Sequence, residues 1–205
     1  LKPMPKDNHI SRRLDIQDKF VVMYSGTISI SSIATLERIL ESAKKLRDDP
    51  DIRFVIVGEG FKKQQLVNKA RSLDLNNVTF LPFQPYEDLP ALLASSDVLL
   101  VPLDKEKSLL SVPSKLYNFM AVGRPIMGLA HESSEVRALI EETGCGVCVS
   151  PDGVSEMAGM FESLKESPDE RARMGRNSRL YAEENYSKIR VLDRLEGIIG
   201  DLNGG

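Results

Sequence analysis

The stretch SVPSKLYNFMAVGRP, residues 111–125, decides the fold of this chain. It predicts a short helix whose two ends are both marked in the sequence. Pro113 suits the first turn of a helix, and a serine such as Ser114 can cap the free amide groups. Gly123 predicts a left-handed stop, and Pro125 prevents the helix from continuing.

The predicted helix follows an apolar run, Val98–Val101, which ends at Pro102. A helix that starts beyond the carboxyl end of a buried strand points its free N–H groups into the crevice above the sheet. Lys115 lies in the first turn, where a cation is unfavourable for the helix dipole. Two interpretations of Lys115 stay open: it contacts an anionic group in the crevice, or it is a solvated side chain.

The rest of the chain alternates short apolar runs with helical patterns. The apolar runs predict strands near residues 20–24, 54–57, 78–81, 98–101, 125–129 and 147–149, and everything beyond Val154 favours helix. Strand hydrophobicity that is continuous rather than alternating is typical of a parallel sheet covered on both faces. We therefore predict an α/β fold, a doubly wound six-stranded parallel sheet of the Rossmann-like kind, with its ligand site beyond the strand carboxyl ends.

Composition excludes several classes of protein. The 205 residues, 41% hydrophobic and 28% charged, fit one globular domain. A net charge of -3 argues against a nucleic-acid partner, which usually requires a basic surplus. No apolar run approaches the roughly 20 residues that span a bilayer, and no signal-peptide pattern is present, so we expect a cytoplasmic location. Because the sequence starts at Leu1 rather than Met, we expect a fragment of a longer protein.

The two cysteines, Cys145 and Cys148, have the CxxC spacing of a redox pair or half a metal site. A redox pair normally opens a helix, whereas these residues enter an apolar strand from a glycine-rich turn. There is no second CxxC, and His9 and His131 lie far away in the sequence. We interpret both as small structural thiols, and we predict no metal site.

The loops after the first three strands are the other candidates for ligand contacts. Residues 25–32 contain Gly26 and several hydroxyl groups that could approach a phosphate, but they lack GxGxxG. Residues 58–63 read GEGFKK, so Lys62 and Lys63 could either contact a phosphate or form a solvated helix start. Phe83 could offer an apolar face to a base, although ordinary packing is the alternative. No P-loop or nucleophile elbow is present.

Four segments together carry a family resemblance. Each is a modest signal alone, but their order and spacing are specific: IVGEG (56–60), NVTFL (77–81), SDVLLVP (96–102) and PSKLYNFMAVGRPI (113–126). From about Phe20 to about Arg194 the chain resembles the C-terminal half of a GT-B glycosyltransferase of family 4, group 1. The PSKL form of the motif is similar to a subgroup that builds surface polysaccharides.

The resemblance implies a donor-binding domain for a nucleotide-diphosphate sugar, with transfer that retains the anomeric configuration. The acceptor would be a glycan or a lipid-linked molecule, and neither a cofactor nor a metal ion is expected. Amide groups and lysines would stabilise the charge on the departing diphosphate. The donor-binding positions that it implies are Gly26, Thr27, Lys63, Phe83, Ser114, Lys115 and Asn118. No catalytic residue is assigned to this chain, because the resemblance places the acceptor site and any base in the missing N-terminal domain.

The chain departs from the family pattern in two places. After the first strand, Thr27 and Ser32 stand nearest to the positions of the arginine and lysine that members usually carry. Many members carry two glutamates eight residues apart, where this sequence has Leu110 and Asn118. Asn118 can still exchange hydrogen bonds with a ribose, whereas Leu110 cannot. A divergent transferase fits this departure, and two alternatives stay open: half of a GT-B nucleotide-sugar epimerase, and a non-catalytic nucleotide-sugar-binding or partner module.

The expected domain organisation has three parts. Residues 1–19 are an interdomain linker or arm, residues 20–186 form the donor-binding domain, and residues 187–205 form a C-terminal helix. That helix carries one apolar face, made of Ile189, Leu192, Leu195, Ile199 and Leu202. It either crosses to the missing N-terminal domain or packs on its own domain. We expect any peripheral contact of the full-length protein with the inner face of a membrane to involve the missing half.

Overall fold

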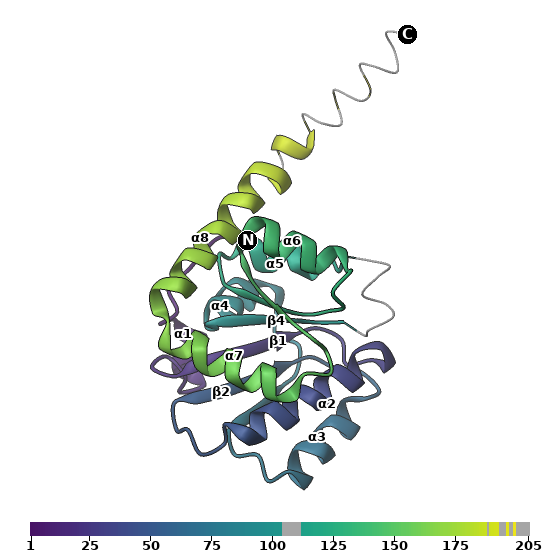
Figure 1. The fold of residues 1–205 in the computed structure, drawn as a ribbon. Coiled ribbons are helices and arrows are strands. Elements are labelled where there is room, and N and C mark those ends of the chain that lie inside the picture. The colour runs from purple at the N-terminus through teal and green to yellow at the C-terminus, as the bar shows by residue number, and fades with distance from the viewer. Residues whose placement is uncertain (104–111, 188, 193–195, 197–198, 200–205) are drawn as a thin grey trace.

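Six parallel strands form a sheet in the order β3-β2-β1-β4-β5-β6 (Figure 1). The structure, a computed structural model, describes residues 1–103, 112–187, 189–192, 196 and 199. The strands are β1 (Phe20–Ser25), β2 (Ile52–Val57), β3 (Val78–Leu81), β4 (Val98–Pro102), β5 (Ile126–Leu129) and β6 (Gly146–Val149). Every neighbouring pair is parallel. The predicted doubly wound, six-stranded sheet is therefore confirmed.

Helices cover both faces of the sheet (Figure 1). They are α1 (His9–Arg13), α2 (Ile30–Lys45), α3 (Lys63–Ser72), the short 3-10 helix η1 (Tyr86–Asp88), α4 (Leu89–Ala94), α5 (Lys115–Ala121), α6 (Glu135–Thr143), α7 (Val154–Glu166) and α8 (Pro168–Tyr186). From β1 to β6 the chain alternates strand and helix, as the sequence predicts. The motif helix is α5, and Gly123 adopts the expected left-handed conformation just after it, with φ +69°.

Alternate residues along the strands belong to two separate hydrophobic clusters, one on each face of the sheet. In β1, Val22 and Tyr24 belong to the cluster packed under α2, α3 and α7. Val21 and Met23 belong to the cluster on the opposite face, under α1, α4, α5 and α6. Because burying one large aliphatic side chain contributes about 1.5–3 kcal/mol, these clusters are the main source of stability. The alternation also determines the face on which each residue near the end of a strand lies.

The backbone ladder between β1 and β2 continues into the loops beyond them. The amide of Gly26 donates to the carbonyl of Val57 at 3.0 Å, and the amide of Ile28 donates to that of Glu59 at 2.9 Å. This approach leaves no space for a side chain at Gly58, where an added Cβ would lie 2.0 Å from the carbonyl oxygen of Gly26. The loops after β1 and β2 are thus held together by their backbones.

The segment before β1 packs on the domain, and its helix α1 was not predicted. The Asn8 side chain accepts hydrogen bonds from the amides that start α1 and donates to the carbonyl of Ala91 at 3.0 Å. Ile10 is fully buried, and the ammonium of Lys6 lies 2.5 Å from a carboxylate oxygen of Asp97. A helix of five residues gives too short a hydrophobic pattern to be detected in the sequence.

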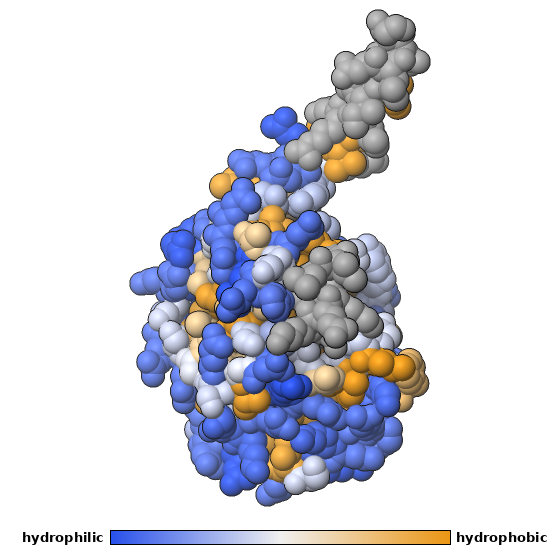
Figure 2. Space-filling view, turned by 45° about the vertical axis from the view of Figure 1, so that its right-hand side comes forward, coloured by the Kyte–Doolittle hydropathy of each residue, from blue (hydrophilic) through white to orange (hydrophobic). Residues whose placement is uncertain are grey.

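Beyond α8, the described residues extend away from the sheet (Figure 1), and hydrophobic atoms are visible along this extension (Figure 2). Ile189, Leu192 and Ile199 are exposed, so these three side chains do not pack on the domain. Leu195 and Leu202, on the same predicted face, lie outside the described residues. A crossing to another domain stays a prediction. In the described part of the chain, no helix is both long and apolar enough to cross a membrane.

Replacing Gly58 by alanine is expected to lower the free energy of unfolding by about 2–4 kcal/mol. The added Cβ meets the Gly26 carbonyl, and the positive φ at this position is strained for any residue that has a Cβ. Gly159 in α7 is the matched control, since an added Cβ there meets no atom within 4 Å. Gly159→Ala is expected to stabilise the chain by up to about 1 kcal/mol. Urea unfolding measures both, and a Gly58→Ala variant as stable as the wild type would contradict the close approach.

Candidate functional site

A cavity lies where the loops after β1 and β4 meet. These strands are neighbours at the point where the strand order reverses, which is the usual ligand position in doubly wound folds. The cavity has a volume of about 440 Å³. Its described lining consists of Tyr24, Ser25, Gly26, Thr27, Ser29, Ser31, Ser32, Pro102, Leu103, Pro113, Ser114 and Lys115.

The chemistry of this lining favours an anion. Two helices, α2 and α5, begin at the cavity, and neither has an acidic residue in its first turn. Helix N-termini attract negative charge through their free amides and their dipole. None of the described lining residues is acidic, and most of the polar ones carry hydroxyl groups that can donate hydrogen bonds.

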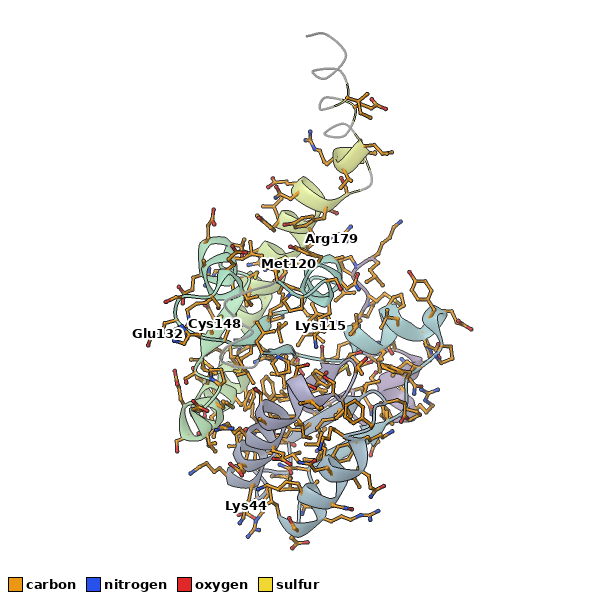
Figure 3. The ribbon with its side chains drawn as sticks, turned by 90° about the vertical axis from the view of Figure 1, so that its right-hand side faces the viewer. Lys44, Lys115, Met120, Glu132, Cys148 and Arg179 are labelled. Carbon is orange, nitrogen blue, oxygen red and sulfur yellow. The ribbon has the colours of Figure 1, made fainter. Side chains whose placement is uncertain are left out.

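Lys115 reaches across the carboxyl edge of the sheet. Lys115 begins α5, a helix that packs in the cluster under α1, α4, α5 and α6. Its ammonium nevertheless lies 4.4 Å from the ring centroid of Tyr24, which belongs to the cluster on the opposite face of the sheet. Gly26 leaves space for this path, because an added Cβ would lie 3.1 Å from the Lys115 nitrogen. In Figure 3, Lys115 lies inside the body of the ribbon, whereas Lys44 lies at the periphery. The Lys115 side chain is therefore half-buried against Tyr24 rather than fully solvated.

Burial changes the ionisation of both partners. It lowers the pKa of Lys115 to about 8, because the ammonium loses hydration. It also raises the pKa of Tyr24, so the phenol stays neutral and donates a hydrogen bond to the carbonyl of Thr27 at 2.8 Å. With no acidic residue in the described lining, the charged form of Lys115 would gain strongly from a bound anion.

The structure brings together four of the seven predicted donor-binding residues, namely Gly26, Thr27, Ser114 and Lys115. Lys63 does not line the cavity, and its ammonium pairs with Glu59 at 2.6 Å. Phe83 is exposed in the loop after β3, also outside the lining. Whether any of the seven contacts a donor stays a prediction.

Asn118 borders a different cavity. It is exposed on α5 and faces a space of about 350 Å³ that is also lined by Arg179 and Tyr186 near the end of α8. The helix α5 thus borders one cavity with its first residue and another with Asn118. The position of the first missing glutamate, Leu110, lies outside the described residues, as does Ser111 at the start of the motif.

The capping role expected for Ser114 is wrong. Ser114 does occupy the N-cap position of α5, but its side chain makes no capping hydrogen bond. Its backbone is helical, with φ -57° and ψ -28°, whereas a capping serine needs an extended backbone to aim its oxygen at the amides. Ser114 instead lines the cavity.

Sequence reasoning missed Tyr24, which forms the surface beneath the Lys115 ammonium. Within the apolar run of β1, Tyr24 looked like one more core residue, and its ring is indeed 1% exposed. The available signal was its position next to the end of β1, two residues before Gly26. A buried tyrosine there needs a partner for its hydroxyl and brings a ring face to the sheet edge.

The two cysteines lie apart from this cavity, one just before β6 and one within it, and both are free thiols. Burial raises the pKa of Cys145 and raises that of Cys148 to about 12. Thiols so rarely ionised are unreactive, in line with their interpretation as structural residues. Among the described residues, no three histidine, cysteine or acidic side chains come together as a possible metal-binding group.

Comparison with known proteins gives consistent similarities. The family model described as "Glycosyl transferases group 1" matches residues 6–181. The putative colanic acid biosynthesis glycosyl transferase WcaI of Escherichia coli is 35% identical over 198 residues, which cover 95% of this chain and 46% of that protein. Alpha-D-kanosaminyltransferase of Streptomyces kanamyceticus is 28% identical, over 94% of this chain and 48% of its own length. The chain thus spans about half the length of these relatives.

Solved structures share the fold. HepE of Anabaena, crystallised in complex with UDP, superposes with a TM-score of 0.76 at 19% identity, covering 98% of this chain and 54% of that one. The C-terminal domain of the group 1 glycosyl transferase LpcC of Francisella tularensis has a TM-score of 0.71 at 18% identity, covering 91% of this chain and 96% of that domain. The chain therefore shares the fold of about half of HepE and of nearly all of the LpcC C-terminal domain.

Lys115→Met is expected to stabilise the free chain at pH 7. The folded pKa of Lys115, about 8, lies below its ordinary value of 10.5. The unfolded state therefore binds the proton more tightly between these values, and wild-type stability rises across that interval. At pH 7 the variant should be more stable by roughly 1–3 kcal/mol, and the difference should vanish above pH 10.5.

Paired urea unfolding at pH 7 and at high pH measures this difference. Lys44→Met is the control, because Lys44 is an exposed residue in the last turn of α2. Its replacement is expected to be neutral or slightly destabilising at pH 7. A Lys115→Met variant no more stable than the wild type at pH 7 would contradict a costly buried ammonium.

Proposed function

The chain belongs to the group 1 glycosyl transferase family, and from this premise we propose that it is the donor-binding half of a retaining glycosyltransferase. The donor is a nucleotide-diphosphate sugar, and the acceptor is a glycan or a lipid-linked molecule. The observation that carries the proposal is the Lys115 ammonium, which lies in a cavity at the reversal of strand order with no acidic residue in its described lining.

The diphosphate of the donor binds in this cavity. Its negative charge meets the ammonium of Lys115 and the amino-terminal ends of α2 and α5. The same groups stabilise the nucleoside diphosphate as it leaves, because negative charge grows on it when the bond to the sugar breaks. The chain itself supplies this positive charge, so we propose that donor binding needs no metal ion.

The remaining predicted residues take peripheral roles in this proposal. Asn118 follows Lys115 by three residues on α5, and its exposed amide could exchange hydrogen bonds with a ribose. Lys63 pairs with Glu59 in the free chain, and this carboxylate would compete with a phosphate for its ammonium. Phe83 has an exposed ring that could stack on a base. Lys115 is the residue on which binding depends most.

The acceptor class is proposed from the relatives. WcaI carries a name that refers to colanic acid biosynthesis, and this supports a role in surface polysaccharide synthesis. The acceptor site and the second domain would be supplied by the rest of a longer protein, as expected from the half-length coverage of the relatives. A cytoplasmic location, at the inner face of a membrane when the acceptor is lipid-linked, completes the proposal.

The chain is expected to bind UDP, and Lys115→Met should weaken that binding about tenfold to a hundredfold, the range for loss of a charge-assisted hydrogen bond. Isothermal titration calorimetry at pH 7, with EDTA present, measures both the affinity and its independence of metal ions. Lys44→Met is the control and should bind like the wild type. Absence of heat with UDP, GDP and ADP on folded protein would contradict the proposed function.

Retention can be tested in the longer protein that contains this chain. Proton NMR of the product should show the same anomeric configuration as the sugar donor. The opposite configuration would contradict a retaining mechanism while leaving donor binding intact. Consumption of the sugar nucleotide without any acceptor, with an epimerised nucleotide sugar as product, would favour the epimerase alternative instead.

A further inference from the structure

Lys115 is held differently from three other half-buried lysines in the described structure. Lys63 pairs with Glu59 at 2.6 Å, Lys69 with Glu41 at 2.8 Å, and Lys165 with Asp49 at 2.6 Å. In these pairs a carboxylate balances the ammonium charge. The ammonium of Lys115 instead lies against the ring of Tyr24, 4.4 Å from the centroid.

We propose that Tyr24 is a positioning residue, whose ring face holds the Lys115 ammonium in the cavity without neutralising it. This inference rests on the proposed function, in which Lys115 binds the donor diphosphate. An aromatic ring attracts a cation through its quadrupole and carries no net negative charge. A carboxylate at this place would compete with the diphosphate for the ammonium, whereas the ring leaves its charge available to the ligand.

Tyr24 is itself fixed firmly enough to serve as such a support. Its ring is 1% exposed and packs in the cluster under α2, and its hydroxyl donates a hydrogen bond to the carbonyl of Thr27 at 2.8 Å. The ring is therefore held at both ends, by packing and by the hydrogen bond. Because Thr27 itself lines the cavity, this hydrogen bond also ties the support to the loop that would face the ligand.

A substitution at Gly26 offers a second way to disturb the contact between Lys115 and Tyr24. An added Cβ would lie 3.1 Å from the Lys115 nitrogen and 3.0 Å from the Tyr24 hydroxyl oxygen. Both distances are tighter than ordinary contacts of a Cβ, so an alanine would push the ammonium away from its place over the ring. Among the described residues that line the cavity, Tyr24 and Lys115 are the two with titratable side chains.

The first experiment needs no ligand. Heteronuclear NMR of the labelled Lys115 side chain measures its pKa in the wild type, in Tyr24→Phe and in Tyr24→Leu. Tyr24→Phe keeps the ring face and should leave the pKa nearly unchanged. Tyr24→Leu removes it and should lower the pKa by about 0.5–1.5, because the charged form loses the attraction of the ring. An unchanged pKa in Tyr24→Leu would overturn the inference.

The second experiment asks whether the ring acts through Lys115. Calorimetry with UDP at pH 7 compares Tyr24→Leu in two backgrounds, with Lys115 present and in Lys115→Met. With Lys115 present, we expect Tyr24→Leu to weaken binding about three- to tenfold. In Lys115→Met we expect almost no further loss, because the effects of two residues that share one interaction are not additive. Equal weakening in both backgrounds would show a merely structural role and would overturn the inference.

Two controls keep the outcomes distinct. If Tyr24→Leu does not fold, Gly26→Ala replaces it in the same pair of backgrounds and is expected to show the same dependence on Lys115. Circular dichroism checks the folding of each variant. A wild-type chain that binds none of UDP, GDP and ADP would refute the proposed function, whereas the pKa comparison would still decide whether Tyr24 holds the ammonium.

Discussion

The close approach of the backbones at Gly26 and Gly58 is the constraint on which both the fold and the candidate site depend. The Gly26 carbonyl lies where a Cβ of Gly58 would be, 2.0 Å from that ideal position. This packing lets the ladder between β1 and β2 continue into the loops that follow them. The same loop then leaves room at Gly26 for the ammonium of Lys115. Glycine is therefore needed at both positions, at Gly58 for the approach of the two loops and at Gly26 for the space that the ammonium occupies.

The direction of the helices makes the two edges of the sheet electrostatically different. Each crossover helix runs antiparallel to the strands, so helix C-termini gather at the amino edge, where the dipole favours cations. Arginines occupy that edge: Arg124 donates to the carbonyl of Ala94 at the end of α4, and Arg179 to that of Ala121 at the end of α5. Lys115 lies at the opposite edge, at the N-terminus of α5, and Lys63 likewise lies at the N-terminus of α3. A cation at this end is unfavourable in the free chain, and a bound diphosphate would reverse the balance.

Much of the fold was predictable because its signals are local. Continuous apolar runs predicted the six strands, and Gly123 predicted the end of α5, since a left-handed residue there suits glycine. The capping role of Ser114 was wrong, because the backbone angles at the start of α5 depend on how the preceding loop enters the helix. The helix α1 was missed because its five residues give too short a hydrophobic pattern, and the contact of Asn8 with Ala91 joins distant parts of the chain.

The sequence by itself determined the α/β class, the strand positions, the place of α5 after β4, and the presence of a lysine in its first turn. These follow from periodicity and from residues that start or stop helices within a few positions. Only the tertiary structure decided that Lys115 lies over Tyr24, that Lys63 pairs with Glu59, and that Asn118 faces a separate cavity. The physical reason is the packing of strands and helices from different parts of the chain, which brings side chains together across the sheet edge and separates others on the same helix.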